Sequence, residues 1–159
     1  MSKARTVDLT PLEEEIMTTT DEENRRIARR VPEEILAEGA FDLIEDLFAE
    51  DAVDQAPLGT DTGRDEIRAG MEAMRAAFPD LSATVEDAVS EDGTVAMRLT
   101  LRGTHEGEFM GVEPTGKTIE VGSMVFTRIE DGKIAERWAQ PDTLGLFRQL
   151  GVVDRSTER

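Results

Sequence analysis

The sequence predicts an α+β domain in which helices precede one curved, mainly antiparallel sheet. Up to residue 78 the apolar residues recur every three or four positions, and beyond residue 80 they recur every second position. Two Glu-Asp-Gly turns, at 91–93 and 130–132, separate strand-like segments. Helices that gather ahead of a sheet must cover one of its faces, so we expect a conical pocket between them.

The length of 159 residues suits one domain with one core. We predict an N-terminal extension over 1–20, a single domain over 21–153 and a flexible tail over 154–159. Within the extension, Thr10-Pro11-Leu12-Glu13 has the pattern of a capping box with proline at the first helical position. This pattern predicts a short helix over 11–17.

The first helix of the domain is expected after Thr20, which forms a second capping box with Glu23. Ile27, Val31 and Ile35 are spaced by four, and Gly39 is placed to end this helix. Pro32 lies inside it and removes a backbone donor, so we expect a kink or a break there.

Two further helical segments and then about four strands follow. FDLIEDLF (41–48) places its apolar residues on one face, and a third helix follows Gly63 and stops at Pro79-Asp80. The strand patterns are TVAMRLTLR (94–102), TIEVGSMVFTRI (118–129) and KIAERWAQ (133–140), in addition to the residues before the first turn. TLGLFRQLG, at the C-terminal end, predicts a short helix.

Composition excludes several functions. The chain has 35 Asp and Glu against 18 Lys and Arg, a net charge of −17, which repels nucleic acid and anionic lipid surfaces. It has no cysteine and no apolar run long enough to span a membrane, so a cytoplasmic protein is expected. The acids are spread along the chain, which is typical of proteins from a high-salt cytoplasm; ordinary acidic solubility is the alternative.

Several motifs, in order, resemble one family. They are LFAEDAVDQAP (47–57), GRDEIRAG (63–70), AAFPDL (76–81), GTHEGEFMGVEPTG (103–116), RIEDGKI (128–134), PD (141–142) and RQLG (148–151). Over about residues 22–151 the chain resembles the SnoaL-like polyketide cyclases, also called ester cyclases. These belong to the nuclear-transport-factor-2-like, cystatin-related, cone-shaped α+β barrels.

The resemblance implies a homodimer with an apolar pocket that takes a small, largely apolar carbonyl compound. The best-known cyclases close a ring by an aldol reaction without a metal or another cofactor, and an aspartate moves the proton. Two positions depart from that pattern. The acid/base aspartate of the cyclases corresponds to Ala139, and a pocket histidine corresponds to Val125. Neither side chain can transfer a proton, so the cyclase mechanism does not carry over residue by residue.

His105 and Asp142 are our candidates for acid/base catalysis, because both match the family pattern. His105 continues the alternating row from Val95 to Gly103, which would place it at the mouth of the pocket. The alternative is a structural histidine bonded to a glycine-rich loop. Asp142 directly precedes the C-terminal helix, so its alternative role is an N-cap.

Arg137, Gln55, Trp138 and Phe109 are the candidates for substrate binding. Arg137 would favour a carboxylate or an enolate, with a surface ion pair as the alternative. Gln55 could bond a ligand from the pocket rim or serve the turn before Pro57. Trp138 could stack on a ligand, but packing is the more common role of a sole tryptophan.

The last strand contains a conflict between two periodicities. Strict alternation places Ile134 and Trp138 on one face and Arg137 on the other. The family pattern places Arg137 and Ala139 toward the pocket, whereas hydrophobicity favours Ile134 and Trp138. A β-bulge would reconcile the two.

Two functions therefore remain open. The first is a cofactor-free enzyme for aldol cyclisation, isomerisation or hydrolysis. The second is a non-catalytic, dimeric module that binds a small molecule, which the losses at Ala139 and Val125 favour. A purely structural dimer is a third interpretation with less support, since a cone-shaped barrel usually holds a ligand. No metal site is expected from a single histidine without cysteine.

The halophilic interpretation predicts a salt-dependent stability. At molar KCl the Debye length falls to about 3 Å, which screens the repulsion among the acidic side chains. We expect the melting temperature to rise from low to molar KCl in a thermal scan. Equal melting temperatures at both salt concentrations would leave only ordinary acidic solubility.

Overall fold

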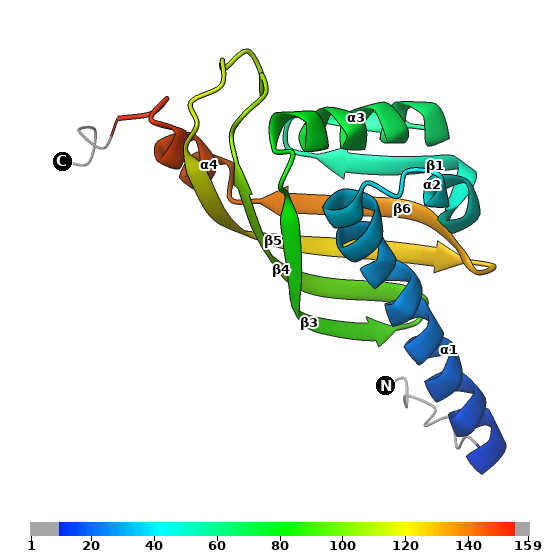
Figure 1. Ribbon diagram of the computed structural model, residues 1–159. Coiled ribbons are helices and arrows are strands. Elements are labelled where there is room, and N and C mark those ends of the chain that lie inside the picture. The colour runs from blue at the N-terminus through cyan, green and yellow to red at the C-terminus, as the bar shows by residue number, and fades with distance from the viewer. Residues whose placement is uncertain (1–9, 155–159) are drawn as a thin grey trace, which may run out of the picture.

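The computed structural model describes residues 10–154, apart from the side chains of residues 16–19, and contains one six-stranded sheet (Figure 1). The strand order is β2-β1-β6-β5-β4-β3. The elements are α1 (Pro11–Arg30), the π-helix η1 (Val31–Leu36), α2 (Leu43–Leu47), β1 (Phe48–Ala56), β2 (Gly59–Thr62), α3 (Arg64–Ala77), β3 (Ser82–Glu91), β4 (Thr94–Thr104), β5 (Thr118–Glu130), β6 (Lys133–Pro141) and α4 (Thr143–Leu150).

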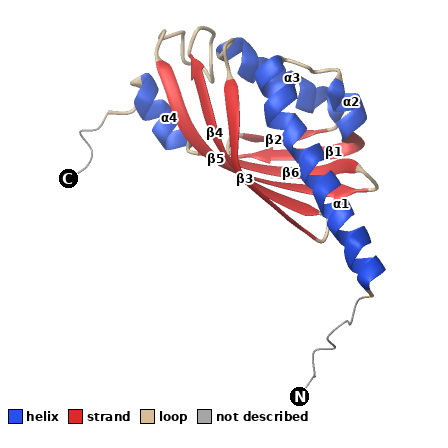
Figure 2. Ribbon diagram, turned by 60° about the horizontal axis from the view of Figure 1, so that its bottom comes forward, coloured by secondary structure: helices blue, strands red, loops and turns tan. Residues whose placement is uncertain are grey.

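The expected α+β class is confirmed, and helices α1, α2 and α3 lie over one face of the curved sheet (Figures 1 and 2). The face of the sheet beneath them is called the inner face below, and the opposite one the outer face. Two apolar clusters fill much of the space between the helices and the inner face. One centres on Val31, Phe48 and Leu99, and the other on Phe78, Leu101 and Leu146.

Helix α1 differs from the expectation of two separate helices. It is continuous from Pro11 to Arg30, so the short helix expected over 11–17 is its first part. The capping box at Thr10 is present: the Thr10 side chain accepts from the Glu13 N–H, and the Glu13 carboxylate accepts from the Thr10 N–H at 2.9 Å. The rest of the predicted extension, residues 1–9, and the tail 155–159 lie outside the described residues. No described helix is both long and apolar enough to cross a membrane.

Pro32 coincides with a change of helix type. The α-helix gives way to the π-helix η1 at Val31, and Pro32 is buried within its first turn. Proline has no N–H to donate, so the regular hydrogen-bond ladder cannot continue through it. Gly39, with φ of +73°, then ends the helical segment as predicted, because glycine adopts this left-handed conformation without strain.

Strands β3 to β6 form the expected antiparallel meander. At both Glu-Asp-Gly turns the Asp and Gly have positive φ, the conformation of a two-residue hairpin loop. Strands β1 and β2 were not predicted. They form a second hairpin, and β1 joins the meander by pairing parallel to β6. The sheet is therefore mainly antiparallel with one parallel junction.

A β-bulge in β6 resolves the conflict between the two periodicities. Arg128 of β5 pairs with Glu136, but the next residue, Ile129, pairs with Ile134, so Ala135 is the extra residue. The bulge changes the side to which the following residues point. Ile134 and Arg137 are consequently both buried on the inner face, and Trp138 lies on the outer face.

Candidate functional site

A row of polar side chains crosses the inner face of the sheet. Thr127 of β5 pairs with Arg137 of β6, Arg137 pairs with Asp54 of β1, and Asp54 pairs with Asp61 of β2. Residues directly opposite one another on neighbouring strands share a face, with Cβ atoms about 4.5–5.5 Å apart. These four side chains, called the inner polar row below, therefore lie side by side.

A nearly buried ion pair holds the middle of the inner polar row. Arg137 Nη1 donates to Asp54 Oδ2 at 2.6 Å, and the two side chains are only 5% and 13% exposed. Charges this deep are strongly destabilising unless they are paired, so each side chain fixes the other. The pair also ties the β1–β2 hairpin to β6.

Three buried atoms of the same row have no protein partner in the described structure. They are Asp54 Oδ1, Arg137 Nε and Thr127 Oγ1, and Thr127 is fully buried. Buried polar groups are nearly always hydrogen-bonded, because leaving one unpaired costs about 1–3 kcal/mol. One acceptor and two donors are thus available to a molecule bound against the inner face.

Asp61 lies at the end of the row, beneath α3. A Cβ added at Gly70 of α3 would lie 2.5 Å from Asp61 Oδ2, so the carboxylate packs against the place where the helix has no side chain. Burial raises the pKa of the Asp61 carboxyl above its ordinary value, and the nearby carboxylates of Asp54 and Glu66 raise it further. The row therefore runs from the fully buried Thr127 to a partly exposed acid at the sheet edge.

The inner polar row is adjacent to the two positions at which the sequence departs from the cyclase pattern. Ala139 lies two residues beyond Arg137 on β6 and pairs directly with Val125 of β5. Val125 is a buried member of the apolar cluster around Val31, Phe48 and Leu99, and Ala139 is partly buried and packs against that cluster. The chain thus keeps polar groups beside the family's acid/base position although that position itself is apolar.

His105 lies on the inner side, as its parity predicted, but far from the inner polar row. Its ring is fully buried, Nδ1 accepts from the Thr115 N–H at 3.2 Å, and Thr115 Oγ1 lies 3.0 Å from Nδ1. Val95 is opposite Thr127 on the sheet, and His105 is ten residues further along, about 30 Å at the strand rise. These hydrogen bonds fix the loop from residue 105 to 117. This placement agrees with the alternative role of His105, a structural histidine bonded to a glycine-rich loop.

Phe109 belongs to the surroundings of His105. The rings of His105 and Phe109 both contact Phe78, each with centroids 5.4 Å from it. Nε2 of His105 is buried and has no partner in the part of the chain that the structure describes. Since Nδ1 accepts a hydrogen bond from the Thr115 N–H, a neutral ring carries its proton on Nε2. The structure therefore places His105 and Phe109 close together, both in contact with Phe78 and at a distance from Arg137.

Asp142 occupies the N-cap of α4. Its Oδ1 accepts from the Gly145 N–H at 2.9 Å, and its side chain is exposed. A Cβ at Gly145 would come within 2.2 Å of the carboxylate, so glycine at this position leaves room for the cap. This geometry agrees with the alternative role of Asp142, the N-cap of the C-terminal helix. The catalytic roles of Asp142 and His105 stay predictions.

Gln55 and Trp138 lie together on the outer face. They are paired across the parallel junction of β1 and β6, and Gln55 Nε2 donates to Glu136 Oε1 at 2.5 Å. Trp138 also pairs with Phe126 of β5, whose side chain is 51% exposed. Their predicted contact with a ligand on the inner face therefore has no support in their placement, and it stays a prediction.

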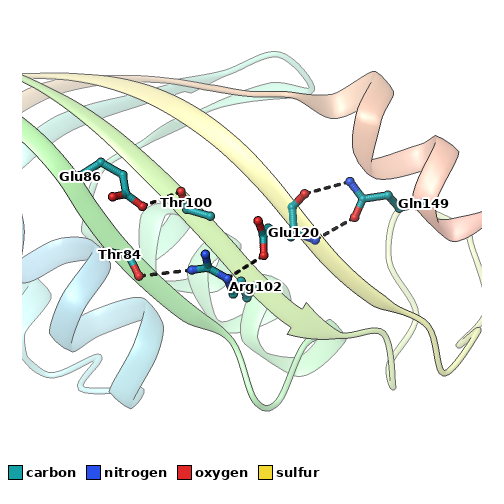
Figure 3. Close-up of polar contacts among 6 residues, drawn as sticks. All are labelled: Thr84, Glu86, Thr100, Arg102, Glu120 and Gln149. Atoms are coloured by element: carbon teal, nitrogen blue, oxygen red, sulfur yellow. Dashed lines mark hydrogen bonds and ion pairs between the residues drawn. The ribbon is translucent and has the colours of Figure 1, made fainter.

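Two open hollows are found on the outer face of the sheet. The first, about 470 Å³, is lined mainly by polar residues, among them Ser82, Arg102, Glu120 and Gln149. Arg102 is paired there with Glu120 at 2.8 Å, and the Gln149 amide bonds both backbone groups of Glu120. The second, about 460 Å³, adjoins Arg128 and Glu136. Arg102, Glu120 and Gln149 of the first hollow already have protein partners (Figure 3), which makes this hollow a weaker candidate than the inner polar row.

Sequence reasoning missed three members of the row: Asp54, Asp61 and Thr127. Their proximity depends on pairing between β1 and β6, and Asp54 and Arg137 are separated by 83 residues in the chain. The available signal was a pair of aspartates, each set within a short strand-like segment on either side of a Pro-Leu-Gly turn.

A curved six-stranded sheet covered on one face by helices defines the class of cone-shaped α+β folds. A family model for the SnoaL-like polyketide cyclases matches residues 26–150. The chain belongs to this family, as the motifs of the sequence predicted.

Curated relatives are ester cyclases. Nogalonic acid methyl ester cyclase of Streptomyces nogalater is 31% identical over 116 residues, which cover 71% of this chain and 87% of that protein. Aklanonic acid methyl ester cyclase DauD of Streptomyces sp. (strain C5) is 33% identical over 90 residues, and the match spans just over half of it, 56% of each chain. Among solved structures, wild-type IdmH from Streptomyces antibioticus has a TM-score of 0.70 at 33% identity, over 80% of this chain and 98% of IdmH.

Thr127→Val tests whether the buried hydroxyl is unpaired in the ligand-free protein. Valine has nearly the same shape, so the variant removes an unsatisfied polar group and is expected to unfold at an equal or higher denaturant midpoint. The control is Thr100→Val on the outer face, which loses the hydrogen bond from Thr100 Oγ1 to Glu86 at 2.9 Å. A loss above about 1 kcal/mol in Thr127→Val would show that this hydroxyl is already bonded.

Proposed function

We propose that the chain binds a small, largely apolar carbonyl compound against the inner polar row and catalyses a cofactor-free acid/base reaction on it. Aldol cyclisation, isomerisation and hydrolysis are the reactions of this kind that the resemblance suggests. The observation that carries the proposal is the set of buried, unpartnered atoms on Asp54, Thr127 and Arg137.

The chemistry of these atoms supports a carbonyl ligand. Arg137 Nε and Thr127 Oγ1 can both donate to one carbonyl oxygen, and they would bind it more strongly as negative charge develops on an enolate. Asp54 Oδ1 can accept from a hydroxyl or enol group of the same ligand. The apolar side chains around the row, including Met97 and Val125, suit the carbon skeleton.

Access is expected from the β1–β2 edge. Exposure increases along the row from Thr127 to Asp54 and Asp61. Met71 of α3 and Met97 of β4 belong to the cluster that covers the inner face, and methionine side chains change rotamer readily. A ligand would therefore enter by displacing flexible side chains beneath α3.

The alternative function is a non-catalytic binding module of the same fold. What favours it is the apolar pair Ala139 and Val125 at the positions of the cyclase acid/base groups. In this alternative the same kind of ligand binds at the inner polar row, but the protein does not convert it. Homodimer formation and a cytoplasmic location belong to both versions as proposals.

The experiment uses 2-naphthol, an aromatic alcohol that stands in for an enolised carbonyl compound, with binding followed by its fluorescence. The double variant Asp54→Asn/Arg137→Met removes the buried pair without leaving one charge unpaired. We expect the Kd to rise about tenfold or more, since a hydrogen bond to a charged group contributes about 1.5–3 kcal/mol.

The matched control is Glu120→Gln/Arg102→Met, which removes an ion pair from the outer face and changes the net charge equally. This control should bind 2-naphthol as tightly as the wild type. The proposal fails if the wild type does not bind the probe, or if both double variants have the same Kd.

The homodimer has a suitable surface on the outer face. Val89, Ala96, Phe126 and Trp138 form an apolar row across four strands, and Val89 and Phe126 are 66% and 51% exposed. A second copy of the chain covering this row would bury these side chains. We expect sedimentation analysis to give a dimer for the wild type and a monomer for Phe126→Arg. Leu58→Arg, at an equally exposed position in the β1–β2 turn, is the control that should stay dimeric.

A further inference from the structure

We propose that Asp61 accepts and returns the proton in the reaction, the role that Ala139 cannot fill. This inference rests on the proposed function, because it takes a carbonyl compound to be bound at the inner polar row. It assigns a residue outside the family's acid/base position, and it depends on the β1–β2 hairpin placing Asp61 beside the ion pair.

The two neighbouring carboxylates have different surroundings. Asp54 is bonded to Arg137 at 2.6 Å, so a cation compensates its charge. Among the side chains that the structure describes, the Asp61 carboxylate has no hydrogen bond and no cationic partner. Asp61 therefore lies next to the ion pair, beside a second carboxylate and without a cation of its own.

The groups around Asp61 all act in the same direction. Asp54 faces it from β1 and Glu66 from α3, and both are acidic; Arg137, from β6, is bonded to Asp54 instead. Burial, then these two carboxylates, raise the pKa of Asp61. A base whose pKa is raised toward the working pH is more effective in removing a proton from carbon.

Unpaired donors lie in the same row, where the oxygen of the substrate would be held. Thr127 is fully buried, and neither its hydroxyl nor Arg137 Nε has a partner among the described residues 10–154. The ionised Asp61 takes a proton from the carbon next to the carbonyl, and the C–H electron pair moves onto the carbonyl oxygen, which Arg137 and Thr127 stabilise. Asp61 then returns the proton to another carbon, in an isomerisation, or to the alkoxide formed when the enolate attacks a second carbonyl. No co-reactant is consumed.

A substitution at Gly70 would shift the Asp61 carboxylate without altering Asp61 itself. An alanine Cβ at this position would lie 2.5 Å from Asp61 Oδ2, so the carboxylate must shift. Gly70 is inside α3, where alanine is the better helix former. Gly70→Ala is therefore expected to keep or raise the melting temperature and yet to impair proton transfer.

The test uses 5-nitro-1,2-benzisoxazole, whose ring opens when a base removes its carbon-bound proton. That C–H electron pair forms the nitrile, the N–O bond breaks, and the electrons leave on a coloured phenolate. We expect Asp61→Asn to lower kcat/KM about 10²- to 10⁴-fold. Gly70→Ala should lower it too, and Asp65→Asn, an exposed acid on α3, should not. The wild-type rate should rise with pH around a midpoint above the ordinary pKa of aspartate.

Stability supplies a second readout that needs no ligand. A raised pKa means that protonated Asp61 stabilises the fold, and this contribution is lost as the pH rises through its folded-state pKa. Asp61→Asn should therefore melt at a higher temperature than the wild type at neutral pH, and this gain should disappear below the ordinary pKa of aspartate.

The outcomes separate the two proposals. If 2-naphthol binds and responds to the Asp54/Arg137 exchange, but Asp61→Asn keeps the wild-type elimination rate, the inference about Asp61 is overturned and the binding site stands. A wild type that binds 2-naphthol yet shows no elimination above that of Asp61→Asn overturns it in the same way. Loss of elimination in Asp61→Asn without any naphthol binding would support Asp61 as the base and overturn the proposed ligand class.

Discussion

The ion pair between Arg137 and Asp54 is the interaction on which the arrangement of the site depends. It spans the parallel junction of β1 and β6, where the β1–β2 hairpin joins the meander. A buried charge is tolerated only with its partner, so the pair constrains how the hairpin attaches to the sheet. Asp61 and Thr127 take their places beside the pair, on either side of it. Replacing such a pair by apolar residues is often neutral or stabilising in proteins, whereas removing one partner alone is strongly destabilising.

The sheet reverses the usual distribution of polar and apolar side chains along two neighbouring rows. Thr127, Arg137 and the two aspartates lie beneath the helices, whereas Phe126 and Trp138 lie on the open face. An antiparallel sheet normally has its apolar residues inside and its polar residues in water. Buried polar groups and exposed apolar groups are the informative exceptions. We propose a ligand at the buried polar groups and another copy of the chain at the exposed apolar ones. The two exceptions occur at successive positions of the same strands.

Local signals in the sequence predicted much of the fold. The spacing of apolar residues identified α3 and the strands of the meander, and the two Asp-Gly turns marked its hairpins. The prediction was weaker where local and non-local preferences compete. The segment over 48–62 contains acids, a proline and glycines, and it becomes a hairpin only because β6 offers a parallel edge. The conflict of periodicities in the last strand indicated a bulge, but its position at Ala135 has no local signal, since it depends on the register with β5.

By itself the sequence determined the family, the helices-before-meander arrangement and the alanine at position 139, where the resemblance places the cyclase acid/base group, because these are properties of residue identity and short-range spacing. The tertiary structure decided which polar residues meet. It placed His105 in a loop, Asp142 at a helix cap and Arg137 beside Asp54. Arg137 and Asp54 are 83 residues apart in the sequence. The physical reason is that side-chain direction alternates along a strand, so one bulge or one strand pairing changes which groups share a face.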